Sequence, residues 1–115
     1  LARMGAAAPD VAVVEIGASP LEPYNGRAAI AAVEDSVQCT VLAASDPYAV
    51  YGVMNAFDMR PDLVTGVAAN TKAGIDLIEA LCDVKALNVT DPDARPALRR
   101  MLTDTLDLAP SALAR

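Results

Sequence analysis

The sequence predicts one α/β domain over residues 1–115, with an open, mostly parallel sheet and helices on both faces, a three-layer arrangement. Three of its apolar runs are nearly continuous rather than alternating, which is typical of strands covered on both faces. Helical patterns separate the runs, so strands recur roughly every 20 to 30 residues, the length of a strand–helix unit. The chain is 54% hydrophobic with only three Tyr and one Phe, and small aliphatic side chains favour tight helix-on-sheet packing.

The apolar runs give the expected strands in chain order. They are Val11–Val14, Cys39–Ala44, Leu63–Ala69 and Val84–Val89. The last run is more mixed in polarity than the others, and we interpret it as an edge strand. Right-handed crossovers between successive strands produce a parallel sheet with helices packed on its faces.

Four helices are expected between and after these strands. High helix propensity favours the first over Gly26–Val33. The second begins after Asp46, a suitable N-cap, with Pro47 at the first helical position. The third follows Asn70 or Thr71, either of which can cap it. The fourth follows the start signal at residues 91–93. The apolar faces of the last three follow helical spacing: Val50, Val53, Met54 and Phe57; Ile75, Ile78 and Cys82; Leu98, Met101, Leu102 and Leu106.

Charge and composition exclude several classes of function. The net charge of −6 repels phosphate backbones, so we expect no nucleic-acid partner. A single nucleotide remains compatible with this charge, because backbone amides and a metal ion neutralise phosphates locally. The absence of histidine removes the commonest general base and the commonest transition-metal ligand.

The cysteines and the apolar runs bear on location. Cys39 and Cys82 lie in apolar stretches without metal-ligand spacing, so we expect two buried, reduced thiols in a cytoplasmic protein. No apolar run approaches the roughly 20 residues of a membrane span, and no signal peptide is recognisable. Because the chain opens on Leu1 and residues 1–8 read like the end of a helix and a loop, we expect a portion of a longer protein.

Ligands of open parallel sheets bind beyond the carboxyl ends of the strands. Glu15 ends the first predicted strand, and a carboxylate at this position suits a hard cation such as Mg²⁺. A solvated Glu at a strand end is the equal alternative. The loop from Gly17 to Gly26 contains two glycines and two prolines and is either a ligand-contacting loop or a connector. Within it, Gly17 and Ser19 are candidate cofactor contacts.

Several other side chains have alternative interpretations. Asn70 follows the third apolar run, and its amide either reads an adenine edge or caps the next helix. Ser45 and Asp46 follow the second run, and capping is the favoured role for Asp46. Tyr48 and Tyr51 form an aromatic wall, a subunit contact or, as we favour, partial packing on the sheet. Arg95, Arg99 and Arg100 are interpreted as a solvated helix face.

Two of these segments resemble a known family. The stretch from Asp10 to Leu21, with Val13-Val14-Glu15 and then glycine, is similar to the segment after the switch strand in the dethiobiotin synthetase family of P-loop proteins. The stretch from Val64 to Asn70 resembles that family's later strand, which ends in an adenine-reading Asn. The resemblance implies a partial P-loop NTPase fold, ATP and magnesium as cofactors, and a phosphorylated carboxylate or carbamate intermediate. It also implies Glu15 as a magnesium-associated acid and Asn70 as an adenine contact.

The chain departs from that family in one important respect. It contains no Gly-x-x-x-x-Gly-Lys-Ser/Thr stretch, and Ile16 separates Glu15 from the following glycine. The leading hypothesis is therefore the carboxyl-terminal half of an ATP-dependent ligase or synthetase that acts on a small carboxylate or amine. The phosphate loop then lies upstream or on a complementary chain, and a homo-oligomer is the other expected assembly.

Two further hypotheses remain open. The first is a non-catalytic α/β module that assembles with or regulates a partner, with an apolar patch at Tyr48, Tyr51 and Phe57. The second is a small-molecule enzyme that uses Glu15 or Glu22 as a carboxylate base. The sequence offers no second catalytic group to pair with either acid, so the catalytic residues are not predicted.

Overall fold

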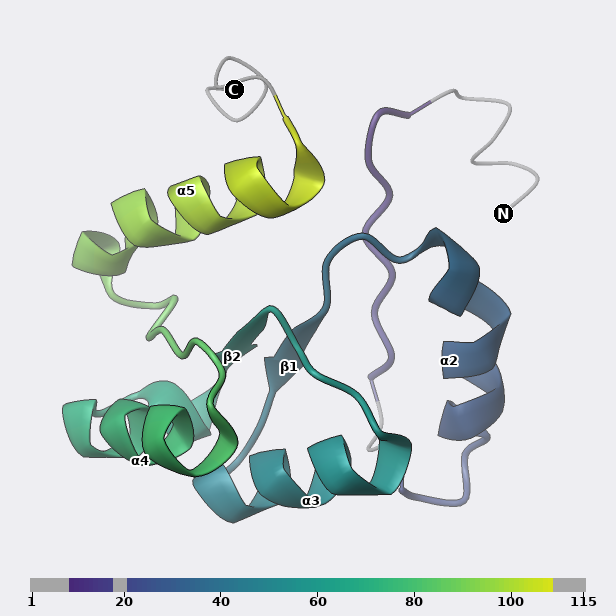
Figure 1. The fold of residues 1–115 in the computed structure, drawn as a ribbon, viewed down its shortest axis with the longest axis horizontal. Helices are drawn as coiled ribbons and strands as arrows, with labels where there is room; N and C mark the ends of the chain where they lie inside the picture. Colours follow the sequence, from purple (N-terminus) through teal and green to yellow (C-terminus); the bar gives the residue numbers. More distant parts are fainter. Residues whose placement is uncertain (1–8, 18–20, 109–115) are drawn as a thin grey trace.

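The structure is a computed structural model that describes residues 9–17 and 21–108. Within these residues the fold contains four helices, two strands and three short 3₁₀ turns (Figure 1). In chain order these are α2 (Gly26–Val33), η1 (Glu34–Ser36), β1 (Val41–Ala43), α3 (Pro47–Phe57), β2 (Leu63–Thr65), η2 (Val67–Ala69), α4 (Lys72–Cys82), η3 (Pro92–Ala94) and α5 (Arg95–Leu106). All four predicted helices are confirmed.

β1 and β2 form a parallel sheet, which confirms the predicted α/β class. Val41 pairs with Leu63 and Ala43 with Thr65. Beyond β2 the expected fourth strand is reduced to one parallel bridge between Val64 and Ala86. The bridge lies at the outer edge, as predicted, and two hydrogen bonds form it: Val64 N–H donates to the Lys85 carbonyl at 2.8 Å, and Leu87 N–H to the Val64 carbonyl at 3.0 Å.

β2 is shorter than its apolar run. The backbone at Gly66 has a φ of 84°, a left-handed value that ends the extended conformation, and residues 67–69 turn into η2. The apolar character of residues 67–69 therefore reflects burial of Ala68 and Ala69 in the core, rather than a longer strand.

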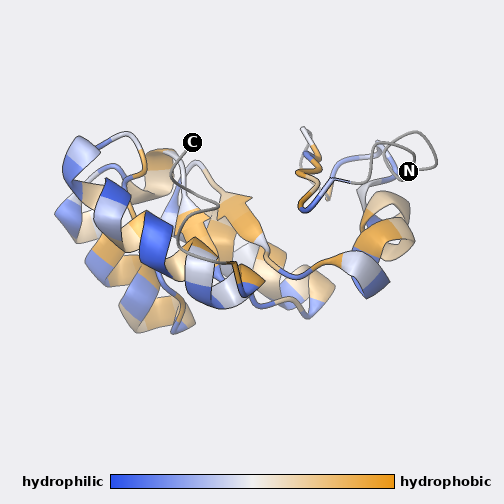
Figure 2. Cartoon of the chain, turned by 90° about the horizontal axis from the view of Figure 1, so that it is seen from above, coloured by the Kyte–Doolittle hydropathy of each residue, from blue (hydrophilic) through white to orange (hydrophobic). Residues whose placement is uncertain are grey.

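The prediction of a strand at Val11–Val14 is wrong for this structure. Residues 9–17 are extended but pair with nothing in the described part of the chain, and every one of them is exposed. A strand is stabilised by a neighbouring edge rather than by local propensity, and this segment has no such neighbour. It runs in the same direction as β1 (Figure 1), and Figure 2 shows it standing apart from the two strands.

The core lies between the sheet and two helices. Val64 and Ala86 pack with Val50 of α3 and with Ile78 and Cys82 of α4. Leu42 and Ala44 of the β1 segment are partly buried against the same cluster. On β1 the neighbouring positions are exposed: Val41 has 49% of its surface accessible, and Ala43 is also exposed. Figure 2 shows the strands in strongly hydrophobic colours beside helices with hydrophilic stretches. The described core thus covers one face of β1.

The helix starts follow the predicted capping chemistry. The Asp46 carboxylate accepts from the Ala49 N–H at 2.9 Å, with Pro47 at the first position of α3. At α4 the Thr71 hydroxyl accepts from the Gly74 N–H at 3.1 Å, so Thr71 rather than Asn70 is the cap. These bonds satisfy amide groups that a helix leaves without an internal partner.

The Arg27 side chain of α2 contacts the end of α3. The Arg27 guanidinium lies 4.6 Å from the centroid of the Phe57 ring, and its Nη2 donates to the Ala56 carbonyl at 3.3 Å. Gly26 is the only buried residue of α2, and α5 has none. Both helices therefore belong to the periphery of the described fold.

The cysteines are both free thiols. Cys82 is buried, as predicted, whereas Cys39 at the start of the β1 segment is only partly buried. None of the described helices combines the length and the apolar character that crossing a membrane requires.

Candidate functional site

The carboxyl edge of the sheet begins at the end of β1. Here the Ser45 hydroxyl donates to Asp46 Oδ2 at 2.9 Å, while Asp46 Oδ1 receives the Ala49 N–H. These bonds favour the ionised carboxyl group, and they lower the pKa of Asp46, the Ala49 amide contributing most. Because both carboxylate oxygens are engaged, the favoured capping role of Asp46 is confirmed.

The end of β2 is packed directly on the end of β1. Ala44 N–H donates to the Thr65 carbonyl at 3.1 Å, and Ala68 N–H donates to the Ala44 carbonyl at 3.0 Å. A Cβ at Gly66 would lie 2.8 Å from the Ala44 carbonyl oxygen, and one at Gly74 would collide with the Ala68 carbonyl. Glycine is therefore required where these backbones meet, and the edge is built from main-chain atoms.

Asn70 lies on this edge, immediately after η2. Its N–H donates to the Val67 carbonyl at 3.1 Å, and its exposed side chain forms no hydrogen bond with any described residue. Since Thr71 caps α4, the alternative in which Asn70 is the cap is wrong. The Asn70 amide therefore keeps a donor and an acceptor available for an external group.

Glu15 and Gly17 belong to the unpaired segment 9–17, and both are exposed. Because this segment runs in the same direction as β1 (Figure 1), it ends toward the carboxyl edge. No hydrogen bond or ion pair among the described residues joins Glu15 to Asp46 or Asn70. Ser19, the third candidate of this loop, lies outside the described residues. The structure thus does not bring Glu15 and Asn70 into contact.

The donors at this edge suit only one kind of magnesium site. Within residues 9–17 and 21–108, no three Asp, Glu or Cys side chains come together as a ligand cluster. Mg²⁺ keeps several waters and is commonly held by one or two carboxylates together with substrate phosphates. Glu15 supplies one exposed carboxylate and therefore fits an ion that arrives with a nucleotide, but not a dedicated protein cage.

Thr65 is a polar residue that the sequence did not single out. It is 8% exposed, and its Oγ1 has no hydrogen-bond partner in the structure. A buried hydroxyl without a partner costs about 1–3 kcal/mol. Its position inside an apolar run does not predict a buried hydroxyl without a partner, because burial of this side chain depends on tertiary packing around β2.

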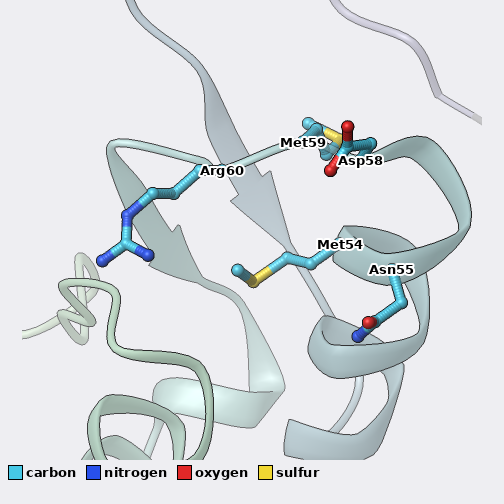
Figure 3. A pocket seen from close by; sticks show the side chains of 5 residues that line it. All are labelled: Met54, Asn55, Asp58, Met59 and Arg60. Carbon is cyan, nitrogen blue, oxygen red and sulfur yellow. The ribbon is translucent and has the colours of Figure 1, made fainter.

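Surface hollows occur at the opposite, amino-terminal side of β2. One, of about 370 Å³, is lined by Met54, Asn55, Asp58, Met59 and Arg60. Figure 3 shows the Arg60 side chain directed away from the α3 residues, and it pairs with Asp83 Oδ2 at 2.8 Å. The second is lined by Glu79, Asp83, Val84 and Lys85, where the Lys85 ammonium lowers the pKa of Glu79. Both are shallow and lie away from the predicted ligand edge.

The aromatic and basic candidates lie on the surface. Tyr48 is 74% exposed, so the favoured reading in which it packs on the sheet is wrong. Tyr51 is 49% exposed, and both rings are on α3. Arg95, Arg99 and Arg100 are exposed, which confirms the solvated face.

These observations define a small α/β domain with a two-stranded parallel sheet and a backbone-built carboxyl edge. Comparison with protein-family models, curated proteins and solved structures found no match to this chain.

Proposed function

We propose that the domain binds a magnesium–nucleotide complex at the carboxyl edge of its sheet, as the carboxyl-terminal half of a P-loop, ATP-dependent ligase or synthetase. The observation that carries this proposal is the Asn70 side-chain amide, which does not cap α4 and has no hydrogen-bond partner among the described residues. It is exposed immediately after η2, the turn that follows the buried strand β2, while the neighbouring Thr71 accepts the capping bond from the Gly74 N–H. A donor and an acceptor held side by side match the edge of an adenine base.

In this proposal Glu15 is a ligand of the magnesium ion that the nucleotide brings, and Gly17 and Ser19 are the proposed further contacts of the nucleotide. The ion would neutralise phosphate charge, which an acidic chain does not do by itself. The phosphate-binding loop comes from another polypeptide segment. The complete fold is then a three-layer P-loop domain in which further elements cover the exposed Val41 face of β1. A small carboxylate or amine is the proposed second substrate.

Calorimetric titration of the full polypeptide with Mg–ATP tests the proposal. Asn70→Ala should weaken nucleotide binding about 5- to 150-fold, the effect of losing two neutral hydrogen bonds. Asn55→Ala removes an equivalent amide from α3, at the opposite side of the sheet, and should leave affinity unchanged. Absence of any binding heat with the wild-type protein would end the proposal.

The metal role has its own variant. Glu15→Gln keeps the shape and removes the charge, so it should weaken binding of Mg–ATP and leave binding of metal-free ATP unchanged. Glu22→Gln is the matched control, because Glu22 is also exposed and lies in the loop that follows. Equal effects of the two substitutions would contradict a specific role for Glu15.

One observation favours a second candidate function, a non-catalytic module that assembles with a partner. The described segment 9–17 leaves four large apolar side chains exposed, and Val13 is 94% exposed. An apolar stretch of this kind is typical of an interaction site. In this alternative the carboxyl edge has no ligand. Titration with nucleotide then gives no binding heat, while the protein still associates with a partner.

A further inference from the structure

β1 has one occupied and one free edge. Thr40 O accepts from Leu63 N–H at 3.3 Å, and Ala44 N–H donates to Thr65 O at 3.1 Å. Alternate residues of a parallel strand direct their backbone groups to opposite sides. The N–H and C=O groups of Val41 and Ala43 therefore point away from β2, and no described residue bonds to them. This edge is an acceptor site for one more strand.

The same chain has a strand-like segment without an edge. Residues 11–16 are extended, form no hydrogen bond within the described residues, and expose Val11, Val13, Val14 and Ile16. Their apolar character on both faces is that of an interior strand. The segment is long enough to cover the three residues of β1.

The molecule's own segment does not occupy its own edge. It follows the direction of β1 but stands apart from the strands (Figures 1 and 2). The helix that comes after it, α2, is attached to α3 through the contact of Arg27 with Phe57. Within the described residues, one molecule thus exposes both a strand edge with unpaired backbone groups and a strand-like segment that has no strand to pair with.

We propose that residues 11–16 of a second copy add to the free edge of β1, and that the exchange is reciprocal, giving a two-fold symmetric dimer. Two-fold symmetry forms both strand additions at once, because each copy donates a segment and receives one. Charge does not oppose the contact, although each chain carries −6. Glu15 is the one charged side chain in residues 11–16, and β1 has none. The proposal deepens the assembly alternative and does not depend on nucleotide binding.

Sedimentation equilibrium over a range of protein concentrations tests the dimer. Val41→Pro removes an N–H that points to the free edge and breaks no bond to β2, and proline is tolerated at such edge positions. Val13→Lys places a charge in the added strand. Each should raise the dissociation constant of the dimer about tenfold or more. Val41→Thr, which keeps the N–H, and Val89→Lys, at an exposed apolar residue elsewhere, should leave it unchanged.

Two sedimentation results would overturn the proposal: a wild-type protein that is monomeric at every concentration, or a dimer that Val41→Pro and Val13→Lys leave intact while urea unfolding shows both variants folded. Disulfide trapping separates the second copy from the molecule's own segment. Val13→Cys with Ala43→Cys, in a Cys39→Ser background, should oxidise to a covalent dimer. A disulfide-closed monomer would assign the edge to the same chain and reject the exchange.

Discussion

Gly66 and Ala44 meet main chain to main chain where the two strands end. A Cβ at position 66 would lie 2.8 Å from the Ala44 oxygen and 2.9 Å from its nitrogen, and Gly66 has a φ of 84°. Both the close approach and the backbone angle therefore require glycine. This junction fixes how residues 67–70, including the candidate ligand residue Asn70, leave the sheet.

Gly66→Ala should destabilise the domain by about 1–3 kcal/mol, since it adds strain and a backbone clash. Gly52→Ala is the matched control. Gly52 lies inside α3, and an added Cβ would meet nothing within 4 Å, so this substitution should stabilise by roughly 0.5–1 kcal/mol. Urea unfolding monitored by circular dichroism measures both. Equal stabilities of the two variants would contradict the requirement for glycine at position 66.

Asp46 should make stability depend on pH in the acid range. Its pKa is lower in the folded protein than in the unfolded chain, so its contribution is complete above the unfolded pKa of about 3.9. The contribution is lost as the pH falls through the folded pKa. Asp46→Asn keeps the capping acceptor but has no charge to lose. Its free energy of unfolding should therefore lie below that of the wild type at neutral pH and approach it in strong acid. Urea midpoints at several pH values test this, and parallel curves for both proteins would contradict it.

Thr65→Val should be neutral or stabilising, by up to about 1–3 kcal/mol, because valine has the same shape and removes the partnerless hydroxyl. Thr65→Ser keeps the hydroxyl and deletes a buried methyl group, so it should be destabilising. Thermal unfolding compares the pair. A large loss of stability in Thr65→Val would mean that the hydroxyl has a partner in the folded protein.

The two thiols should react at different rates. Burial raises the pKa of both, and the Asp62 charge adds to the effect at Cys39. Cys39 is partly exposed while Cys82 is buried, so an alkylating reagent should modify Cys39 in the native protein and Cys82 only after unfolding. Mass spectrometry of digests identifies the site, with Cys39→Ser as the control. Equal native rates at the two sites would contradict the packing around Cys82.

The helices were predictable because their signals are local. Asp46 followed by Pro47 marks the start of α3, and apolar spacing marks the buried face. The first strand was not, because residues 11–14 carry the right pattern but need a hydrogen-bonding edge that sequence periodicity does not report. The end of β2 depended on the backbone angle of Gly66, which an apolar run conceals.

The candidate site was predictable only in part. Position relative to the strands selected Asn70, whereas the choice between Asn70 and Thr71 as the cap rests on the geometry of the Gly74 amide. Sequence reasoning passed over Thr65, because a hydroxyl becomes significant only once neighbouring elements bury it. The relation of Glu15 to the other candidates likewise depends on a segment that the described core does not hold.

The contact of Arg27 with Phe57 has a consequence for local unfolding of the molecule. Arg27 joins α2 to α3 through one cation–π contact and one exposed hydrogen bond, while Val64 at the centre of the core is fully buried. Separation of α2 from α3 should therefore need far less free energy than global unfolding. Amide exchange would begin in α2, leaving β2 and α4 protected, and a protease would cleave at α2 while the region from β1 to α4 persists as a resistant fragment.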